Sequence, residues 1–184
     1  MKNALILHGT WGNPEENWFR WLETELTKKG YKVWVPDLPE ADKPDIPRYN
    51  KFIFDKWQFD SDSILIGHSS GAVAILGLLQ ELSDNVMVDK AILVAGFKDD
   101  LGIKAVKKMF EYQFDWDKIK RHSKKFIFIH SDNDPHVPKE HGEFLQEKLD
   151  GELVVLPGQG HFSVSTAGEK YKQFPELLKY IYDR

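Results

Sequence analysis

The chain contains no cysteine. This absence excludes a disulfide framework, a cysteine-ligated zinc site and a cysteine nucleophile. A chain without cysteine is compatible with a reducing compartment, and we expect a cytoplasmic protein.

Long apolar runs and clustered basic residues are also missing. No run approaches the roughly 18 apolar residues that a membrane span needs, and the first run, Ala4 to Leu7, is too short for a signal peptide. Lys and Arg number 25 against 29 Asp and Glu, which gives a net charge of -4 without a basic stripe. Because phosphate contact needs clustered Lys and Arg, we expect neither a nucleic-acid nor a membrane partner.

The remaining composition is that of an ordinary globular domain. The chain has 184 residues, of which 41% are hydrophobic and 29% are charged, and it contains no repeat, low-complexity stretch or linker. This length is sufficient for one domain with its own core, so we expect residues 1–184 to form a single domain. A monomer is the default expectation.

Short apolar runs alternate with amphipathic segments along the chain. Strands are predicted at 4–7, 31–35, 63–66, 90–95, 126–129 and 153–156. Helices are predicted at 16–29, 48–58, 70–82, 137–149 and 167–182, with a loop at 36–47 and a partly helical stretch at 96–123. Uniformly apolar strands separated by helices are typical of a parallel sheet covered on both faces. Right-handed crossovers then predict a three-layer α/β/α fold with a doubly wound six-stranded sheet, whose ligands bind at the carboxyl ends of the strands.

The third predicted strand leads into the pentapeptide GHSSG, which runs from Gly67 to Gly71 and matches the pattern G-x-S-x-G. A strand before it and a helix after it are the context of a nucleophile elbow, in which the glycines leave room for a tight turn and the hydroxyl of Ser69 projects. The alternative is an ordinary strand-to-helix turn in which Ser69 or Ser70 caps the helix. His68, the variable residue of the pattern, is given no catalytic role.

The last predicted strand leads into GQGHF, which places His161 between glycines in a late loop. A general-base histidine belongs at this edge of the sheet. The alternative is a surface-loop histidine, which is the commoner fate of a lone histidine.

The fifth predicted strand leads into SDNDPHVP at 131–138, which offers a carboxylate to orient that histidine. Asp134 is ranked first, Asp132 second, and the pair Asp99 and Asp100 after the fourth strand third. The alternative for Asp132 or Asp134 is a capping role at the helix predicted to begin at Val137.

The first predicted strand leads into HGTW, in which His8 and Gly9 precede Thr10 and Trp11. An oxyanion hole needs two backbone N–H groups aimed at the developing negative charge. We expect one from Ser70 and the other from Thr10 or Trp11. The alternative is a turn with a packed tryptophan.

Four motifs thus follow four strands, in the order serine, acid, histidine that an α/β-hydrolase topology requires. A metal site is not expected, because the chain has no H-E-x-x-H pattern and because His136 and His141, five residues apart, do not share a helix face. The chain also has no G-x-G-x-x-G pattern. We therefore expect no cofactor.

The sequence resembles the small, cap-less serine hydrolases of the α/β-hydrolase fold that are related to retinoblastoma-binding protein nine. The resemblance covers nearly the whole chain, and its residues are His8-Gly9, the segment 17–22, the pentapeptide 67–71, Asp134-Pro135 and 160–162. It implies a single α/β-hydrolase domain and a cofactor-free triad of Ser69, Asp134 and His161. A retinoblastoma-type partner is not expected, because the L-x-C-x-E peptide needs a cysteine.

The expected activity is that of a carboxylesterase that acts on small or short-acyl esters through an acyl-enzyme. The stretch between the fourth and fifth predicted strands, 96–125, is too short for a large lid domain, which favours an open site and small substrates. Two kinds of alternative stay open. One is a peptidase, thioesterase, acyltransferase or lyase on the same fold, and the other is a binding protein with little or no catalytic activity.

Overall fold

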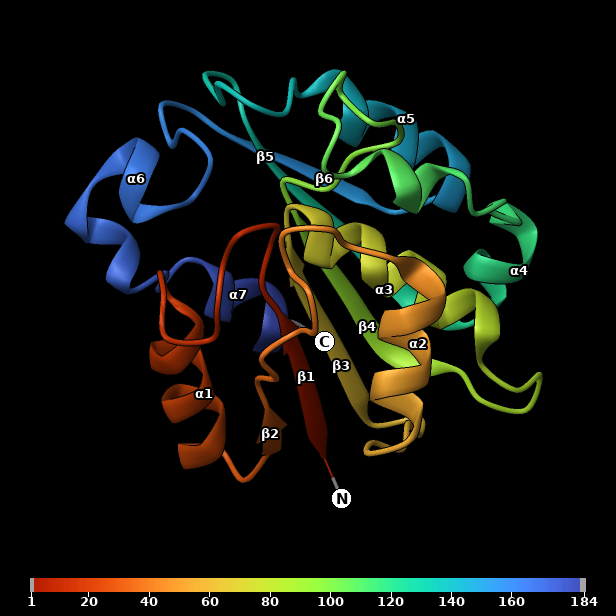
Figure 1. The fold of residues 1–184 in the computed structure, drawn as a ribbon. Helices are drawn as coiled ribbons and strands as arrows, with labels where there is room; N and C mark the ends of the chain where they lie inside the picture. Colours follow the sequence, from red (N-terminus) through yellow and green to blue (C-terminus); the bar gives the residue numbers. More distant parts are fainter. Residues whose placement is uncertain (1, 183–184) are drawn as a thin grey trace.

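The computed structural model describes residues 2–182, so Met1, Asp183 and Arg184, at the ends of the predicted domain, lie outside it. Its centre is a six-stranded sheet in which every neighbouring pair is parallel, in the order β2-β1-β3-β4-β5-β6 (Figure 1). The strands are β1 (Asn3–Leu7), β2 (Lys32–Trp34), β3 (Ser63–His68), β4 (Val88–Val94), β5 (Ser123–Ser131) and β6 (Glu152–Leu156). This sheet confirms the predicted doubly wound α/β fold.

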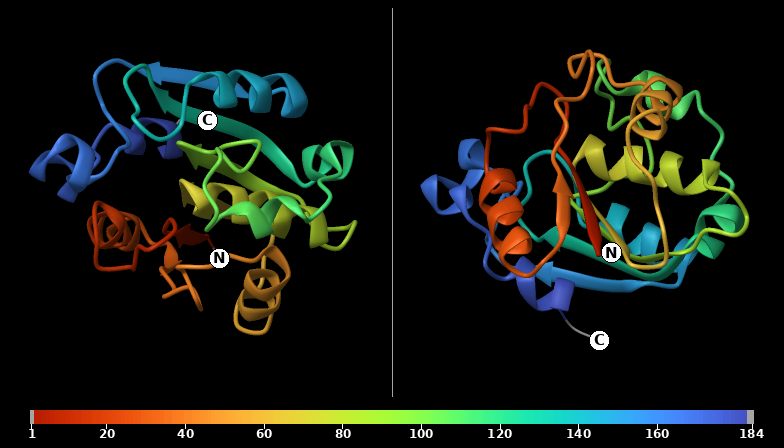
Figure 2. Two further views of the ribbon diagram at one scale, coloured as in Figure 1. Left: turned by 45° about the horizontal axis from the view of Figure 1, so that its top comes forward. Right: turned by 90° about the horizontal axis from the view of Figure 1, so that it is seen from below.

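The helices lie on both sides of the sheet, as Figure 2 shows from below. They are α1 (Phe19–Lys28), α2 (Ile46–Phe54), α3 (Ser70–Glu81), α4 (Trp116–Arg121), α5 (Glu140–Leu149), α6 (Val164–Ala167) and α7 (Leu177–Tyr182), with 3₁₀ turns η1 (Lys107–Phe110) and η2 (Glu169–Lys172). Successive strand residues point to opposite faces, so Leu5 and Leu7 of β1 belong to the core cluster on the face that α2, α3, α4 and α5 cover. Ala4 and Ile6 of the same strand pack with α1 and α7.

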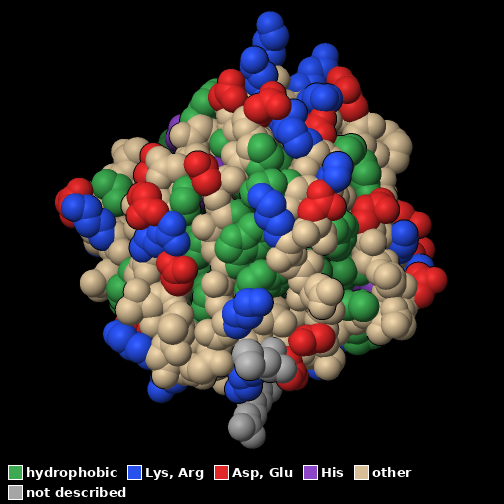
Figure 3. Space-filling view, turned by 60° about the horizontal axis from the view of Figure 1, so that its bottom comes forward, with side chains coloured by type: hydrophobic (Ala, Val, Ile, Leu, Met, Phe, Trp, Pro, Cys, Tyr) green, Lys and Arg blue, Asp and Glu red, His purple; other side chains and the backbone are tan. Residues whose placement is uncertain are grey.

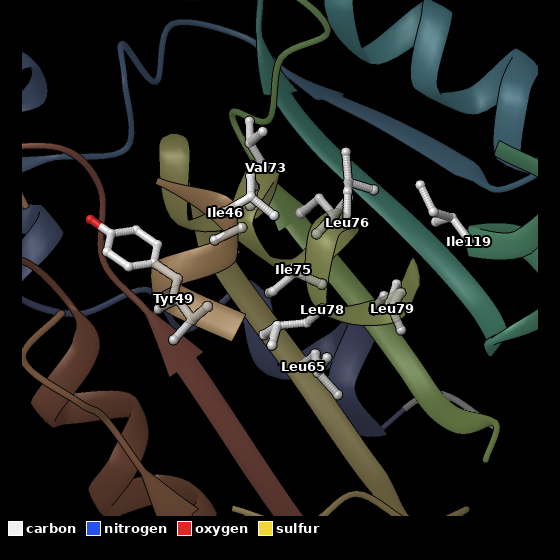
Figure 4. Packing of buried hydrophobic residues seen from close by; sticks show 14 of the residues in the cluster. Ile46, Tyr49, Leu65, Val73, Ile75, Leu76, Leu78, Leu79 and Ile119 are labelled. Atoms are coloured by element: carbon white, nitrogen blue, oxygen red, sulfur yellow. The ribbon is translucent and has the colours of Figure 1, made fainter. Parts of the chain in front are cut away.

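Helix α3 is held rigidly between the sheet and α2. Every residue from Ser70 to Leu79 is buried. The α2 side chains Ile46 and Tyr49 belong to the same cluster, as Figure 4 shows. The Asn50 amide also donates to the Gly77 carbonyl, at 3.1 Å. The helix that follows Ser69 therefore has a fixed position and direction.

The chain order places two loops side by side at the carboxyl ends of the strands. Strand β1 lies between β2 and β3, so the chain leaves β1 toward one edge of the sheet and returns on its other side. Leu7 at the end of β1 is in register with Gly67 near the end of β3. A crevice forms in parallel sheets where the connections diverge in this way.

The predicted helix at 167–182 is wrong. The chain there forms α6, the turn η2 and α7 in place of one helix. Gly168 has φ of +82° at the end of α6, and Pro175, which has no N–H to donate, lies before α7. Three helix starts also differ, and α1 begins at Phe19 in place of the predicted residue 16. Helix α2 begins earlier, at Ile46, because the Asp45 carboxylate accepts from the Arg48 N–H, and α5 begins later, at Glu140, after Pro138.

Charges of both signs are interspersed on the surface that Figure 3 shows, around a centre of hydrophobic side chains. Within residues 2–182, no helix combines the length and the apolar character that crossing a bilayer demands.

Candidate active site

Ser69 lies in a strained turn between β3 and α3. Its φ is +55° and its ψ is -124°, a conformation that non-glycine residues rarely adopt. Such a backbone costs about 1–3 kcal/mol and persists only where its surroundings enforce it. Here the Ser69 N–H donates to the Val94 carbonyl at 2.8 Å, and α3 begins at the next residue. The Ser69 hydroxyl makes no capping hydrogen bond, which contradicts the helix-cap alternative for this residue.

The loop after β1 packs directly against this turn, and two glycines make the approach possible. A Cβ atom on Gly71 would lie 2.5 Å from the carbonyl oxygens of both Leu7 and His8. A Cβ atom on Gly9 would lie 3.0 Å from the Cβ of Ser69. A side chain at Gly71 would clash with this backbone, and one at Gly9 would crowd Ser69, which explains two of the glycines that the sequence patterns contain.

Two unoccupied backbone donors flank Ser69. The N–H groups of Thr10 and Ser70 have no hydrogen-bond partner within residues 2–182. The Thr10 hydroxyl donates to the Ser70 hydroxyl at 2.7 Å, which ties the two segments together. The Trp11 N–H, in contrast, donates to the Ala41 carbonyl at 3.0 Å. The expectation that Trp11 could supply the oxyanion donor is therefore wrong, and its ring, 67% exposed, is not a packed core side chain either.

His161 and Asp134 form a buried hydrogen-bonded pair. The distance from His161 Nδ1 to Asp134 Oδ2 is 2.7 Å, and the Asp134 side chain is only 1% exposed. The other oxygen of Asp134 accepts from the N–H groups of His136, at 2.8 Å, and Val137, at 3.0 Å. Burial raises the pKa of Asp134, but the hydrogen bond to His161 and these backbone donors outweigh burial and hold the pKa below its ordinary value. The carboxylate is therefore ionised near neutral pH.

The loop after β5 also holds the histidine loop through its backbone. Three consecutive side chains before Asp134 each accept a hydrogen bond from a consecutive backbone N–H of 158–160. The pairs are Asp132 with Gly158 (2.8 Å), Ser131 with Gln159 (2.9 Å) and Asn133 with Gly160 (2.7 Å). Asp132, the second-ranked acid, thus positions the loop and does not contact the imidazole. Asn133 was not among the predicted site residues, although it lies in the run of short polar residues at 131–134.

Two residues just before helix α1 also hold the loop that carries His161. The Trp18 indole N–H donates to the Phe162 carbonyl at 3.1 Å, and the Asn17 side-chain oxygen accepts from the Val164 N–H at 2.8 Å. Both residues lie in the segment 17–22 that carries the family resemblance. Fully buried Trp18 belongs to the core, while Asn17 lines the pocket.

Buried histidines surround His161. His68 Nε2 donates to the His161 carbonyl at 2.8 Å, and the two ring centroids are 4.8 Å apart. Burial lowers the pKa of His68 to about 3, so this ring is neutral at neutral pH. His8 is also buried, with Nδ1 donating to the Gly9 carbonyl at 2.9 Å and Nε2 accepting from the Leu38 N–H at 3.0 Å. Burial lowers the pKa of His8 as well.

Ser69 and His161 line one pocket of about 240 Å³. Within residues 2–182, Ser69 Oγ makes no hydrogen bond to His161, and such bonds are often long before a substrate binds. The third-ranked acids lie elsewhere, because Asp99 pairs with Lys98 at 3.2 Å and Asp100 accepts from the Gly102 N–H at 2.9 Å. The part of the chain that the structure describes gathers no three side chains in a metal-binding arrangement.

Comparisons with known proteins identify the family and the fold. Residues 4–183 match the family described as "Serine hydrolase". The chain is 25% identical to serine hydrolase RBBP9 of Rattus norvegicus over 183 residues, which cover 97% of this chain and 92% of that protein. The crystal structure of the ydeN gene product of Bacillus subtilis has a TM-score of 0.90 at 25% identity and covers 98% of this chain and 97% of that one.

More distant structures share the fold. Est1E of Butyrivibrio proteoclasticus, solved with ferulic acid bound, has a TM-score of 0.72 at 17% identity and covers 98% of this chain and 90% of its own. The match of the family to nearly the whole sequence, together with the parallel sheet and the turn at Ser69, shows that the chain belongs to the serine hydrolase family of the α/β-hydrolase fold.

Proposed function

We propose that the protein is a carboxylesterase for small or short-acyl esters, in which Ser69, Asp134 and His161 form the catalytic triad. The observation that carries the proposal is the 2.7 Å contact between His161 Nδ1 and the buried Asp134 carboxylate, in the pocket that the strained Ser69 turn enters. Serine, histidine and carboxylate in this relation activate a hydroxyl for attack on a carbonyl.

In the first half of the reaction, Ser69 Oγ attacks the ester carbon and His161 Nε2 takes the hydroxyl proton. The negative charge on the carbonyl oxygen is stabilised by the N–H groups of Thr10 and Ser70, which have no other partner in the described chain. His161 then donates its proton to the leaving alcohol oxygen. The products of this half are the alcohol and an acyl group on Ser69.

In the second half, His161 removes a proton from water as the water oxygen attacks the acyl carbon. The bond between the acyl carbon and Ser69 Oγ then breaks, His161 returns the proton to Oγ, and the acid is released. Asp134 stabilises the protonated imidazole in both halves. Neutral His68 and His8 favour the same cycle, because neither adds a positive charge beside the imidazolium.

The form of the pocket supports small acyl groups. Its volume is about 240 Å³, and the segment that follows β4 supplies much of its apolar lining, namely Phe97, Leu101, Ile103 and Val106. Trp11, Phe19 and Val137 supply the rest. The connection from β4 to β5 contains only η1 and α4, so it adds a wall to the pocket and no lid domain.

The proposal is tested with purified wild-type protein and the variant Ser69→Ala. We expect the wild type to react with a fluorophosphonate probe and to hydrolyse p-nitrophenyl acetate, and the variant to do neither. Ser83→Ala is the matched control, because Ser83 is an exposed serine after the end of α3. A folded wild type that neither labels nor turns over would refute the proposal and leave the binding-protein alternative. Hydrolysis of thioester or aminopeptide substrates in preference to esters would select the other enzymes on this fold.

A further inference from the structure

The pocket has two chemically different halves, and the reaction decides which part of the substrate enters each. His161 must protonate the leaving oxygen, so the leaving group lies on the side of the His161 loop. On that side the pocket offers the hydroxyls of Ser163 and Ser165 and the amide of Asn17, beside the apolar ring of Phe19. The opposite side carries the apolar segment after β4 and therefore receives the acyl group.

The polar half continues into a second hollow outside the pocket. Glu16, Asn17 and Ser165 line both the pocket and this hollow, which has a volume of about 640 Å³. Trp21 of α1 forms part of its wall, and its ring is partly buried against the core. We call this hollow the α1 groove. Because the groove adjoins the polar half of the pocket, the alcohol part of an ester that is too large for the pocket would extend into the groove along α1.

The basic side chains in the α1 groove are already paired. Arg20 bonds to Glu15 through Nε (2.9 Å) and Nη2 (2.6 Å) and to Glu23 through Nη1 (2.7 Å). Lys172 pairs with Glu169 at 2.5 Å. Among the described residues that line the α1 groove, an anionic leaving group therefore meets no unpaired cation, and the carboxylate of Glu16 opposes it.

The groups that remain available in the α1 groove are both donors and acceptors. Within residues 2–182, Glu16 Oε2, the Asn17 side-chain nitrogen and Trp21 Nε1 have no hydrogen-bond partner. An apolar alcohol would cover these groups without satisfying them, which is costly. An ammonium group could pair with Glu16 but offers no acceptor to Asn17 and Trp21. A hydroxyl both donates and accepts, so it satisfies all three.

We propose that the natural leaving group is a neutral polyhydroxy alcohol of pyranose type, esterified to a small apolar acyl group. This inference rests on the proposed esterase function and adds the class of alcohol. The bond between the acyl carbon and the sugar oxygen breaks, the Ser69 Oγ–acyl bond forms, and the Ser69 proton reaches the sugar oxygen through His161. Water then releases the acid, so no other reactant is needed.

The test compares three acetates that differ in the alcohol. Methyl 6-O-acetyl-glucopyranoside is the expected substrate, cyclohexylmethyl acetate has a ring of the same size without hydroxyls, and acetylcholine carries a cation. We expect kcat/KM for the sugar ester to exceed that for each of the other two by about tenfold or more, because several hydrogen bonds distinguish them. In Glu16→Gln and Trp21→Leu we expect this ratio to fall severalfold, whereas in the control Glu25→Gln it stays at the wild-type value, because Glu25 pairs with Lys28 and neither residue lines the groove.

Each other outcome overturns the inference in a recognisable way. Equal kcat/KM values for the sugar and cyclohexyl esters, with p-nitrophenyl acetate still hydrolysed, would refute the polyol and leave the esterase proposal intact. A preference for acetylcholine would show that Glu16 selects cations. Loss of p-nitrophenyl acetate hydrolysis and of fluorophosphonate labelling in the wild type would refute the esterase and the polyol together. Labelling of each variant by the probe reports whether its site is folded.

Discussion

Replacement of Asp134 by asparagine tests the assignment of the acid most directly. The Asp134→Asn side chain keeps the size of the original and an oxygen that can accept from the His136 and Val137 N–H groups. It loses the negative charge, and its amide can donate to His161 Nδ1. The imidazole proton would then sit on Nε2, where it blocks acceptance of the Ser69 proton.

The expected loss can be estimated from the geometry. The carboxylate and the imidazolium are in contact, at 2.7 Å between Oδ2 and Nδ1, with the Asp134 side chain only 1% exposed. Two opposite charges centred about 4 Å apart attract by about 4 kcal/mol at an effective dielectric constant of about 20. Loss of that amount from the transition state slows the reaction roughly a thousandfold, and the wrong tautomer adds to the loss.

The measurement is kcat for the hydrolysis of p-nitrophenyl acetate, and thermal unfolding shows whether each variant is folded. Asp132→Asn is the matched control, since an asparagine oxygen can still accept from the Gly158 N–H, and its kcat should stay within a few fold of wild type. The reasoning would be refuted if Asp134→Asn kept most of its kcat while Asp132→Asn or Asp99→Asn lost it.

Three further changes follow from contacts of the same site. Gly71→Ala would place a Cβ 2.5 Å from the Leu7 carbonyl oxygen, so we expect a loss of about 3 kcal/mol in urea unfolding and weaker fluorophosphonate labelling. His68→Phe removes the 2.8 Å hydrogen bond to the His161 carbonyl, so kcat should fall about tenfold while KM changes little in steady-state kinetics. His130 is fully buried, neither ring nitrogen has a partner among the described residues, and burial lowers its pKa to about 4. Between about pH 6.5 and 4, the unfolded chain therefore binds a proton at His130 that the folded chain does not, so the free energy of unfolding falls as the pH falls through this window. Urea unfolding of His130→Leu at pH 7 and pH 4 should show a fall that is smaller by about 3 kcal/mol. Unchanged stability for Gly71→Ala, a change confined to KM for His68→Phe, or an unaltered pH dependence for His130→Leu would each contradict the corresponding argument.

The sheet was predictable because its strands are apolar on both faces. Ile64, Leu65 and Ile66 show this pattern, and all three are buried between the two layers of helices. The loops that follow four strands then had to meet at one edge, so the positions of Ser69, Asp134 and His161 followed from topology. The last predicted helix failed because its amphipathic pattern was read across Gly168 and Pro175, two breakers that the sequence displays.

The hydrogen bonds between loops were not predictable in the same way. Asn133 and Gly160 are 27 positions apart, and their bond depends on how two irregular segments lie against each other. The same holds for the N–H of Trp11, whose direction follows from a φ of +58° that no periodicity reveals. Sequence patterns thus indicate which chemical groups form the candidate site, whereas the orientation of the backbone donors depends on the tertiary structure.

The alternation of side chains along the strands also explains why the pocket has two halves. Phe162, beside His161, packs with Trp18 and α1 on one face of the sheet. Phe97 and Val106 pack with α2 and α3 on the other face. Because Ser69 lies at the carboxyl end of β3 between these faces, the segment after β4 can change without displacing the residues that hold His161. In the esterase that we propose, acyl selection and proton transfer would therefore depend on separate parts of the core. We expect substitutions at 97–106 to alter which acyl group is accepted while the pair of His161 and Asp134 stays in place.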